Sequence, residues 1–167
     1  GVGESALTST TTGNSYVGIG THSLSAGATH FFNTGIGHQA LRYNTNNHNT
    51  GIGYWAGRAN TSGTENLFGG SRAGRNNTTG SYNVLLGSEA GGAVTTANYC
   101  VALGATALDA LTTGNNNTAL GYGALGSVTT SVQNVAVGAY ALSSNTGTKN
   151  VATGTSALFS NTSGEFN

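Results

Sequence analysis

Five residues near the middle of the chain carry side chains that are well suited to recognise a ligand. They are Gln39, Tyr54, Trp55, Arg72 and Glu89. Aromatic faces beside hydrogen-bonding and charged groups suit sugar rings and protein partners alike. The same residues also fit a second interpretation, in which they only decorate and pack a corner of the fold. The sequence thus offers a candidate adhesion corner rather than a reaction.

General acid–base catalysis by carboxyl groups needs two of them held close together. The acidic residues are Glu4, Glu65, Glu89, Asp109 and Glu165. Glu4 and Glu89 share the corner side of the repeat described below but lie five copies apart, about 24 Å at roughly 4.8 Å per strand. We therefore expect no carboxylate pair within one chain, no enzymatic activity and no cofactor.

Thiol and imidazole groups are the remaining candidates for chemistry. Cys100 is expected to be a buried structural thiol rather than a nucleophile, and one cysteine excludes an internal disulfide framework. His22 and His38 fall in adjacent copies of the repeat at the outer corner, whereas His30 and His48 fall in the polar turn. A metal site needs converging ligands, so we expect surface histidines and no metal.

These residues belong to a chain that repeats itself. A glycine recurs after an aliphatic residue every 17 residues, with two steps of 16. These anchor glycines are Gly3, Gly20, Gly37, Gly53, Gly70, Gly87, Gly104, Gly121, Gly138 and Gly154. Residues 1–167 therefore form one array of about ten copies. The first and last copies are incomplete, so we expect the chain to be a fragment of a longer one.

Three other columns follow the same frame. Three residues after the anchor stands alanine, four before it asparagine, and eight after it threonine. The asparagines are Asn33, Asn49, Asn66, Asn83, Asn117, Asn134 and Asn150, with Tyr16 and Cys100 as exceptions. The threonines are Thr11, Thr45, Thr61, Thr78, Thr95, Thr112, Thr129, Thr146 and Thr162, broken by Ala28. Asparagine ladders are expected to hold the copies in register.

Composition excludes several partners. Charged residues make up 6% of the chain, against roughly 25% in typical globular proteins, and the formal net charge is zero. A neutral chain has no electrostatic footprint for nucleic acid or an anionic membrane. No apolar run approaches 18 residues, so we expect no membrane insertion in this segment, and no signal peptide is visible.

The period and the residue types predict an all-β fold. Seventeen residues are too few for helix-pair repeats, and glycine costs about 1 kcal/mol relative to alanine inside a helix. Two or three short strands with their corners would use one repeat, so each copy is expected to form one coil of a parallel β-solenoid or β-roll. The strand before each anchor, a short Ala-Leu strand after it and a polar Asn-Thr-Gly turn would complete the coil.

Alternation along the anchor strand assigns two faces. The residue before the anchor is expected to form the core stripe: Val2, Ile19, Ile36, Ile52, Leu86, Leu103, Leu120 and Val137. The opposite face is small: Gly1, Gly18, Gly35, Gly51, Ala102, Ala119, Ala136 and Ala152. Small residues allow close approach, so this face is expected to pack against a neighbouring subunit.

The strings NVAVGAYAL (Asn134 to Leu142) and NTALGYGAL (Asn117 to Leu125) resemble the head repeats of trimeric autotransporter adhesins and related repeats of phage and other surface fibres. The resemblance covers essentially the whole chain. It implies a left-handed parallel β-roll, three chains side by side in a homotrimer, and adhesion at a surface. The unit here is longer than the usual head repeat.

The expected function is that of a non-enzymatic structural segment of an extracellular or virion surface fibre, with a cell-surface glycan or protein as receptor. An ice-binding or glycan-binding solenoid that uses the threonine column is the alternative. Secretion would also expose the N-x-Ser/Thr sequons to glycosylation. They begin at Asn60, Asn76, Asn77, Asn116 and Asn161.

Overall fold

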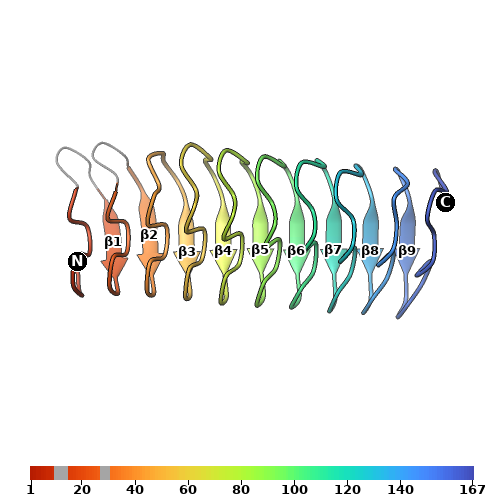
Figure 1. Ribbon diagram of the computed structural model, residues 1–167, viewed down its shortest axis with the longest axis horizontal. Coiled ribbons are helices and arrows are strands. Elements are labelled where there is room, and N and C mark those ends of the chain that lie inside the picture. The colour runs from red at the N-terminus through yellow and green to blue at the C-terminus, as the bar shows by residue number, and fades with distance from the viewer. Residues whose placement is uncertain (10–14, 27–30) are drawn as a thin grey trace.

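The computed structural model describes residues 1–9, 15–26 and 31–167, which form a parallel β-solenoid (Figure 1). His30, Thr11 and Ala28 lie outside the described residues. Within these ranges nine strands form one sheet in chain order: β1 (Tyr16–Ile19), β2 (Asn33–Ile36), β3 (Thr50–Ile52), β4 (Leu67–Gly69), β5 (Val84–Leu86), β6 (Val101–Leu103), β7 (Thr118–Leu120), β8 (Val135–Val137) and β9 (Val151–Thr153). No described segment forms a helix that could cross a membrane.

Strand register follows the sequence repeat. Each strand pairs in parallel with the next through equal positions, so that Ala102 lies beside Ala119 and Ala119 beside Ala136. The first copy contributes an isolated parallel bridge between Val2 and Ile19. The expected all-β solenoid, with one anchor strand in each coil, is confirmed.

The two faces of the sheet are the reverse of those predicted. The small middle residues of the strands point into the coil, and Ala102, Ala119 and Ala136 are fully buried. The aliphatic column expected to form the core points outward instead, with Ile52 and Leu103 each 46% exposed. The small-residue face is therefore the interior of the coil and cannot be the contact with a neighbouring subunit.

The narrowness of the coil explains this reversal. A Cβ atom on Gly51 would lie 2.8 Å from Cγ of Leu41 and 3.0 Å from the carbonyl oxygen of Ala56 on the opposite wall. The coil thus has room for one large side chain between its walls, and in most coils a leucine from the far wall supplies it. Fully buried leucines of this kind are Leu24, Leu41, Leu108, Leu125 and Leu142.

The Ala-Leu segment forms this far wall as a series of turns and is not the second strand that was predicted. Its N–H groups alternate between two directions. Ala90 N–H donates to the Gly87 carbonyl within the coil (3.2 Å), whereas Gly91 N–H donates to Ala107 in the next coil (2.8 Å). The alternation needs left-handed backbone at every second residue, such as Glu89 (φ 60°) and Leu108 (φ 54°).

The anchor glycine makes the corner between strand and wall. Gly87 has φ 138°, and a Cβ atom there would collide with the carbonyl group of Gly104 in the next coil. Glycine is thus required both by the backbone angle and by the close stacking of coils. The corner lies at the lower edge of the solenoid as drawn in Figure 1, and the polar turns lie at the upper edge.

Buried amide ladders connect the coils, as predicted. Asn66 N–H donates to Oδ1 of Asn49 (3.1 Å), and Nδ2 of Asn66 donates to the carbonyl of Gly80 in the following coil (2.8 Å). Each rung satisfies polar groups that burial would otherwise leave unpaired. The column is fully or almost fully buried at Asn33, Asn49, Asn66, Asn83, Asn117, Asn134 and Asn150.

A second buried amide ladder, which the sequence interpretation missed, lies seven residues after the anchors. Asn77 donates to Asn60 (2.8 Å), and Asn60 donates to Asn44 (2.6 Å). The next residue in this column is Val94, which has no side-chain donor, and Oδ1 of Asn77 is left without a partner among the described groups. The interior then becomes apolar through Val94, Leu111 and Val128, all fully buried.

Candidate functional site

The five residues of the predicted adhesion corner come from consecutive coils at the lower edge of the solenoid. Four of them stand two residues after an anchor and share left-handed backbone: Gln39 (φ 55°), Trp55 (φ 60°), Arg72 (φ 59°) and Glu89 (φ 60°). The fifth, Tyr54, precedes Trp55. The corner glycine and this backbone geometry project the side chains along one edge, so that the structure does bring them together.

A stack of aromatic rings begins the site. The His38 ring lies parallel to that of Tyr54, with centroids 5.5 Å apart and an interplanar angle of 10°. Tyr54 stacks in turn on Trp55 at 4.8 Å and 16°. The Tyr54 side chain is exposed, whereas Trp55 is half-buried and its Nε1 has no hydrogen-bond partner among the described groups. The stack therefore lies at the exposed lower edge of the solenoid.

Arginines extend this aromatic stack onto the wall of turns. The guanidinium group of Arg58 lies over the rings of Trp55 (4.9 Å) and Tyr43 (5.2 Å), and its Nε donates to Oε1 of Gln39 (2.7 Å). The guanidinium group of Arg42 also lies over the Tyr43 ring, 5.1 Å from its centroid. Cation–π contacts of this kind hold the guanidinium planes in fixed orientations.

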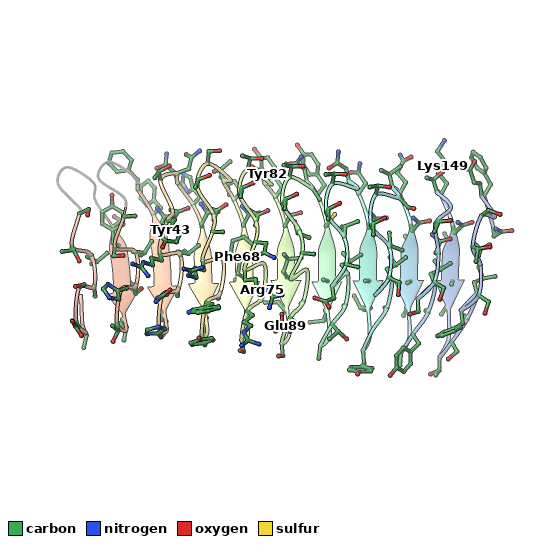
Figure 2. The ribbon with its side chains drawn as sticks, viewed as in Figure 1. Tyr43, Phe68, Arg75, Tyr82, Glu89 and Lys149 are labelled. Carbon is green, nitrogen blue, oxygen red and sulfur yellow. The ribbon has the colours of Figure 1, made fainter. Side chains whose placement is uncertain are left out.

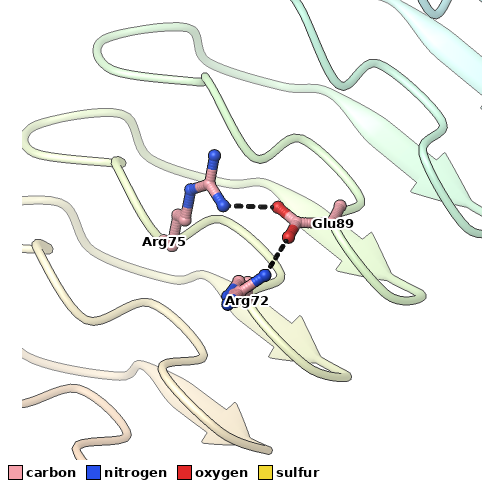
Figure 3. A network of polar contacts seen from close by, with 3 residues as sticks. All are labelled: Arg72, Arg75 and Glu89. Carbon is pink, nitrogen blue, oxygen red and sulfur yellow. Dashed lines mark hydrogen bonds and ion pairs between the residues drawn. The ribbon is translucent and has the colours of Figure 1, made fainter.

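An acidic residue closes the network at its C-terminal end. Glu89 accepts from Arg72 (2.9 Å) through one carboxylate oxygen and from Arg75 (2.7 Å) through the other (Figure 3). The side chains are 44%, 35% and 23% exposed for Arg72, Arg75 and Glu89. Solvent screens such pairs, so each stabilises the fold by no more than about 1 kcal/mol. Their main effect is to orient two guanidinium groups.

Asp109 lies next to Glu89, which corrects the expectation that no two carboxylates meet. A Cβ atom on Gly92 would lie 2.7 Å from Oδ1 of Asp109 and 3.2 Å from Oε2 of Glu89. Burial and then the negative charge of Glu89 raise the pKa of Asp109, and the positive charge of Arg75 opposes this. The pair escaped prediction because its members occupy different positions in adjacent repeats. No pocket was found beside it in the part of the chain that the structure describes.

Four of the cationic and aromatic residues in this network were not predicted. Arg42, Arg58 and Arg75 each stand five residues after consecutive anchors, and Tyr43 follows Arg42. We call these three arginines the arginine column. The sequence contained a signal for them, because three consecutive repeats have arginine at this position and no other repeat has a cationic residue there.

Comparisons with known proteins add no relative. No family model, curated protein or solved structure matches the chain. Function must therefore be inferred from the surfaces themselves.

Cys100 is buried, as predicted, and takes the place of an asparagine in the first amide ladder. Its Sγ donates to the carbonyl of Gly114 (3.3 Å). Burial raises the pKa of the thiol, and the N–H groups of Asn117 and Asn116 oppose that effect. The thiol is thus protonated at neutral pH, which suits a structural role.

The histidines lie apart from one another. His48 is exposed at the upper edge and stacks on Phe32 at 5.0 Å, whereas His38 stacks on Tyr54 at the lower edge. His22 is half-buried at the lower edge. Across the described ranges, no three His, Cys, Asp or Glu side chains are grouped so that they could hold a metal ion.

The predicted glycosylation sites differ in how deeply they are buried. The amides of Asn60 and Asn77 are fully buried in the second ladder, so neither can receive a glycan in the folded coil. Asn161 is half-buried and donates to Asn145 (2.8 Å). Asn76 and Asn116 are exposed and remain the candidates.

A second exposed column runs along the upper edge, five residues before the anchors, and it too has left-handed backbone. Tyr82 and Tyr99 stack there with centroids 5.0 Å apart and planes 5° apart, and Lys149 lies 4.7 Å from the ring centroid of Phe166. Figure 2 shows Tyr82 and Lys149 at this edge and Arg75 and Glu89 on the lower half. Variable side chains therefore occupy both edges of a regular rod.

Proposed function

We propose that the chain is a non-enzymatic structural segment of an extracellular or virion surface fibre, which self-associates side by side and adheres through its lower corner. The observation that carries this proposal is the outer face of the sheet. None of the nine described strands contains a charged residue, and their outward positions are mostly aliphatic. Exposed examples are Val17 (44%), Ile19 (42%), Ile52 (46%), Leu103 (46%) and Val151 (60%).

An apolar surface of this extent favours a protein partner. Nine strands spaced roughly 4.8 Å apart make this face about 38 Å long. Contiguous exposed apolar patches of several hundred Å² mark interaction surfaces in soluble proteins. This face replaces the small-residue face as the contact that we assign to a neighbouring subunit.

A second copy of the chain is the partner that fits best. The outward side chains recur once per coil, so a partner must have the same spacing to meet every rung. Another copy has that spacing by construction, and the absence of charge removes any repulsion between two such faces. The resemblance to trimeric adhesin heads favours three copies around a common axis.

The coil-to-coil bonds support a mechanical role. Besides the amide ladders, threonine hydroxyl groups donate to the carbonyl of the next threonine, as from Thr78 to Thr95 (3.0 Å) and from Thr95 to Thr112 (3.1 Å). Stability in such arrays grows with the number of coils. Because these donors are used within the fold, the threonine column is poorly suited to order ice or a glycan, and we favour the fibre.

The solution mass of the purified chain tests the proposal. We expect light scattering after size-exclusion chromatography to give a multiple of 16.6 kDa, with three copies favoured. Leu103→Lys places a charge at the centre of the aliphatic face and should give monomers. Ser127→Lys, at an exposed site outside the sheet, is the matched control and should leave the mass unchanged. A monomeric wild-type chain at tens of micromolar would contradict the proposal.

A further inference from the structure

We propose that the arginine column and the aromatic rings beside it bind a linear anionic glycan that lies along the fibre axis, with its carboxylate or sulfate groups on the guanidinium groups. This inference rests on the adhesive part of the proposed function and names its ligand class. It does not depend on how many chains associate.

Charge is concentrated at this site. Four of the five cationic residues in the chain lie between residues 42 and 75, and the fifth is Lys149. The carboxylates beside them are Glu89 and Asp109, so four positive and two negative groups leave a local charge of about +2 in a chain of net charge zero. Among the described residues Arg42 and Arg58 have no ion-pair partner. These two are the open anion-binding groups.

The spacing of the arginine column suits a polymer. Arg42, Arg58 and Arg75 occupy one repeat position in three consecutive coils, about 4.8 Å apart along the rod. Like charges this close in adjacent coils repel one another, and an anion bridging them would remove that cost. A guanidinium group also binds carboxylate or sulfate through two parallel N–H bonds. A linear polyanion along the axis would therefore meet the open forks of Arg42 and Arg58 in adjacent coils.

The surrounding residues hold these forks in place before a ligand arrives. Arg58 is fixed between the rings of Tyr43 and Trp55 and by its bond to Gln39. Arg75 is held by Glu89, which also holds Arg72. Fixed side chains lose less conformational entropy on binding, which favours affinity.

The aromatic rings favour a sugar over a nucleic acid. Tyr43 and Tyr54 are 37% and 41% exposed, and their ring edges and hydroxyl groups can contact a sugar that lies alongside the stack without entering it. Single-stranded nucleic acid is held by stacking its bases on aromatic side chains. Here the Tyr54 ring is already stacked between His38 and Trp55 at 5.5 and 4.8 Å, which leaves no gap for a base.

Isothermal titration of the folded chain tests this site. The probes are a heparin hexasaccharide, which carries sulfate and carboxylate, a hyaluronan hexasaccharide, which carries carboxylate alone, neutral cellohexaose and hexathymidylate. We expect an anionic hexasaccharide to bind, with an affinity that falls as salt rises, and cellohexaose not to bind. Binding of heparin alone would assign sulfate, and binding of both would show that carboxylate is sufficient.

Two variants locate the binding site. Arg42→Gln with Arg58→Gln removes the two open guanidinium groups and should weaken binding about 10- to 100-fold. Lys149→Gln removes one positive charge at the far edge and should have no effect. Arg58→Lys keeps the charge and loses the planar fork. It replaces the double variant if circular dichroism shows that the double variant is unfolded. We expect it to weaken binding several-fold.

Three results would overturn the inference: no binding of either anionic hexasaccharide at millimolar concentration, unchanged affinity in folded arginine variants, or hexathymidylate binding as tightly as the sugars. None of these results changes the outcome expected for the solution mass, which tests self-association separately. A chain that binds the sugars but is monomeric would contradict only the proposed assembly.

Discussion

The ring of Phe68 fills the space that Gly57 leaves in the far wall of the preceding coil. A Cβ atom on Gly57, or on Gly74 one coil further, would collide with that ring. In other coils the arrangement is reversed, and Leu41 of the far wall faces Gly51 of the strand. The large side chain thus changes sides while the volume between the two walls is kept.

Removing the Phe68 ring should be costly, and moving the large side chain back to the far wall should recover part of the cost. We expect Phe68→Ala to lower the free energy of unfolding by about 3–5 kcal/mol. Adding Gly57→Leu should restore part of it, because leucine adopts the same left-handed backbone at Leu41 (φ 50°). Urea denaturation of the two single variants and the double variant measures the coupling. Additive effects would contradict the complementarity.

Two reasons for glycine at the anchor, the close stacking of coils and the backbone angle, can be tested separately. Gly87→Ala should lower the melting temperature far more than Gly154→Ala, because only the first Cβ meets the carbonyl of a following coil. Gly154 has a similar φ of 122°, so it reports the backbone cost alone. Thermal melts followed by circular dichroism give the comparison. Equal losses would mean that coil stacking does not require glycine.

Much of the fold could be predicted from the repeat, but the faces of the strand could not. Alternation separates Val135 and Val137 from Ala136, yet it does not say which side is the interior. Larger residues were assigned to the core because burial usually favours them. The sequence did contain a contrary signal. Where the strand position has the large residue Phe68, the far-wall position has Gly57, whereas most other coils have a small strand residue and a leucine in the far wall. Only a close contact between strand and far wall explains this exchange.

Replacing Cys100 with asparagine should stabilise the solenoid. An asparagine there would accept from the N–H of Asn117 and donate to the carbonyl of Gly114, as Asn66 accepts from Asn83 (3.0 Å) and donates to Gly80. We expect a gain of about 1 kcal/mol, the usual net value of one such bond. Cys100→Ala, which supplies no acceptor, should lose stability. A Cys100→Asn chain that melts no higher than wild type would contradict the repair of the ladder.

Ionised Asp109 should reduce stability at neutral pH. Burial and Glu89 raise its pKa above the ordinary value of 3.8, so the folded chain binds this proton more tightly than the unfolded chain. The penalty is absent below that value and grows as the pH rises through the folded pKa. Asp109→Asn should therefore raise the free energy of unfolding at pH 7 by less than about 1 kcal/mol, since the group is partly exposed. The melting temperature should rise with it at pH 7 and stay unchanged at pH 3.

A result of the opposite sign, with Asp109→Asn less stable at pH 7, would mean that attraction to Arg75 outweighs burial and Glu89. Glu65→Gln is a suitable control because Glu65 is an exposed residue of the upper edge. Its melting temperature should follow that of the wild type at both pH values.

The candidate site was predicted in part. Gln39, Tyr54, Trp55, Arg72 and Glu89 were recognised because they vary at one fixed position of the repeat. Arg58 and Arg75 were not recognised, because they stand three residues further along the far wall. Only the left-handed turns of that wall place them beside the corner residues. In a regular strand, residues three positions apart would point to opposite faces. The sequence alone did not reveal those turns, because leucine, glutamate and tyrosine rarely adopt such backbone.

The ladders give the rod a direction. Thr78 donates to Thr95, Thr95 donates to Thr112, and every strand runs the same way. A cut between any two coils would leave hydroxyl donors on one fragment and matching carbonyl acceptors on the other. These threonine hydroxyl groups therefore donate in the chain direction, and the two ends of the rod differ chemically.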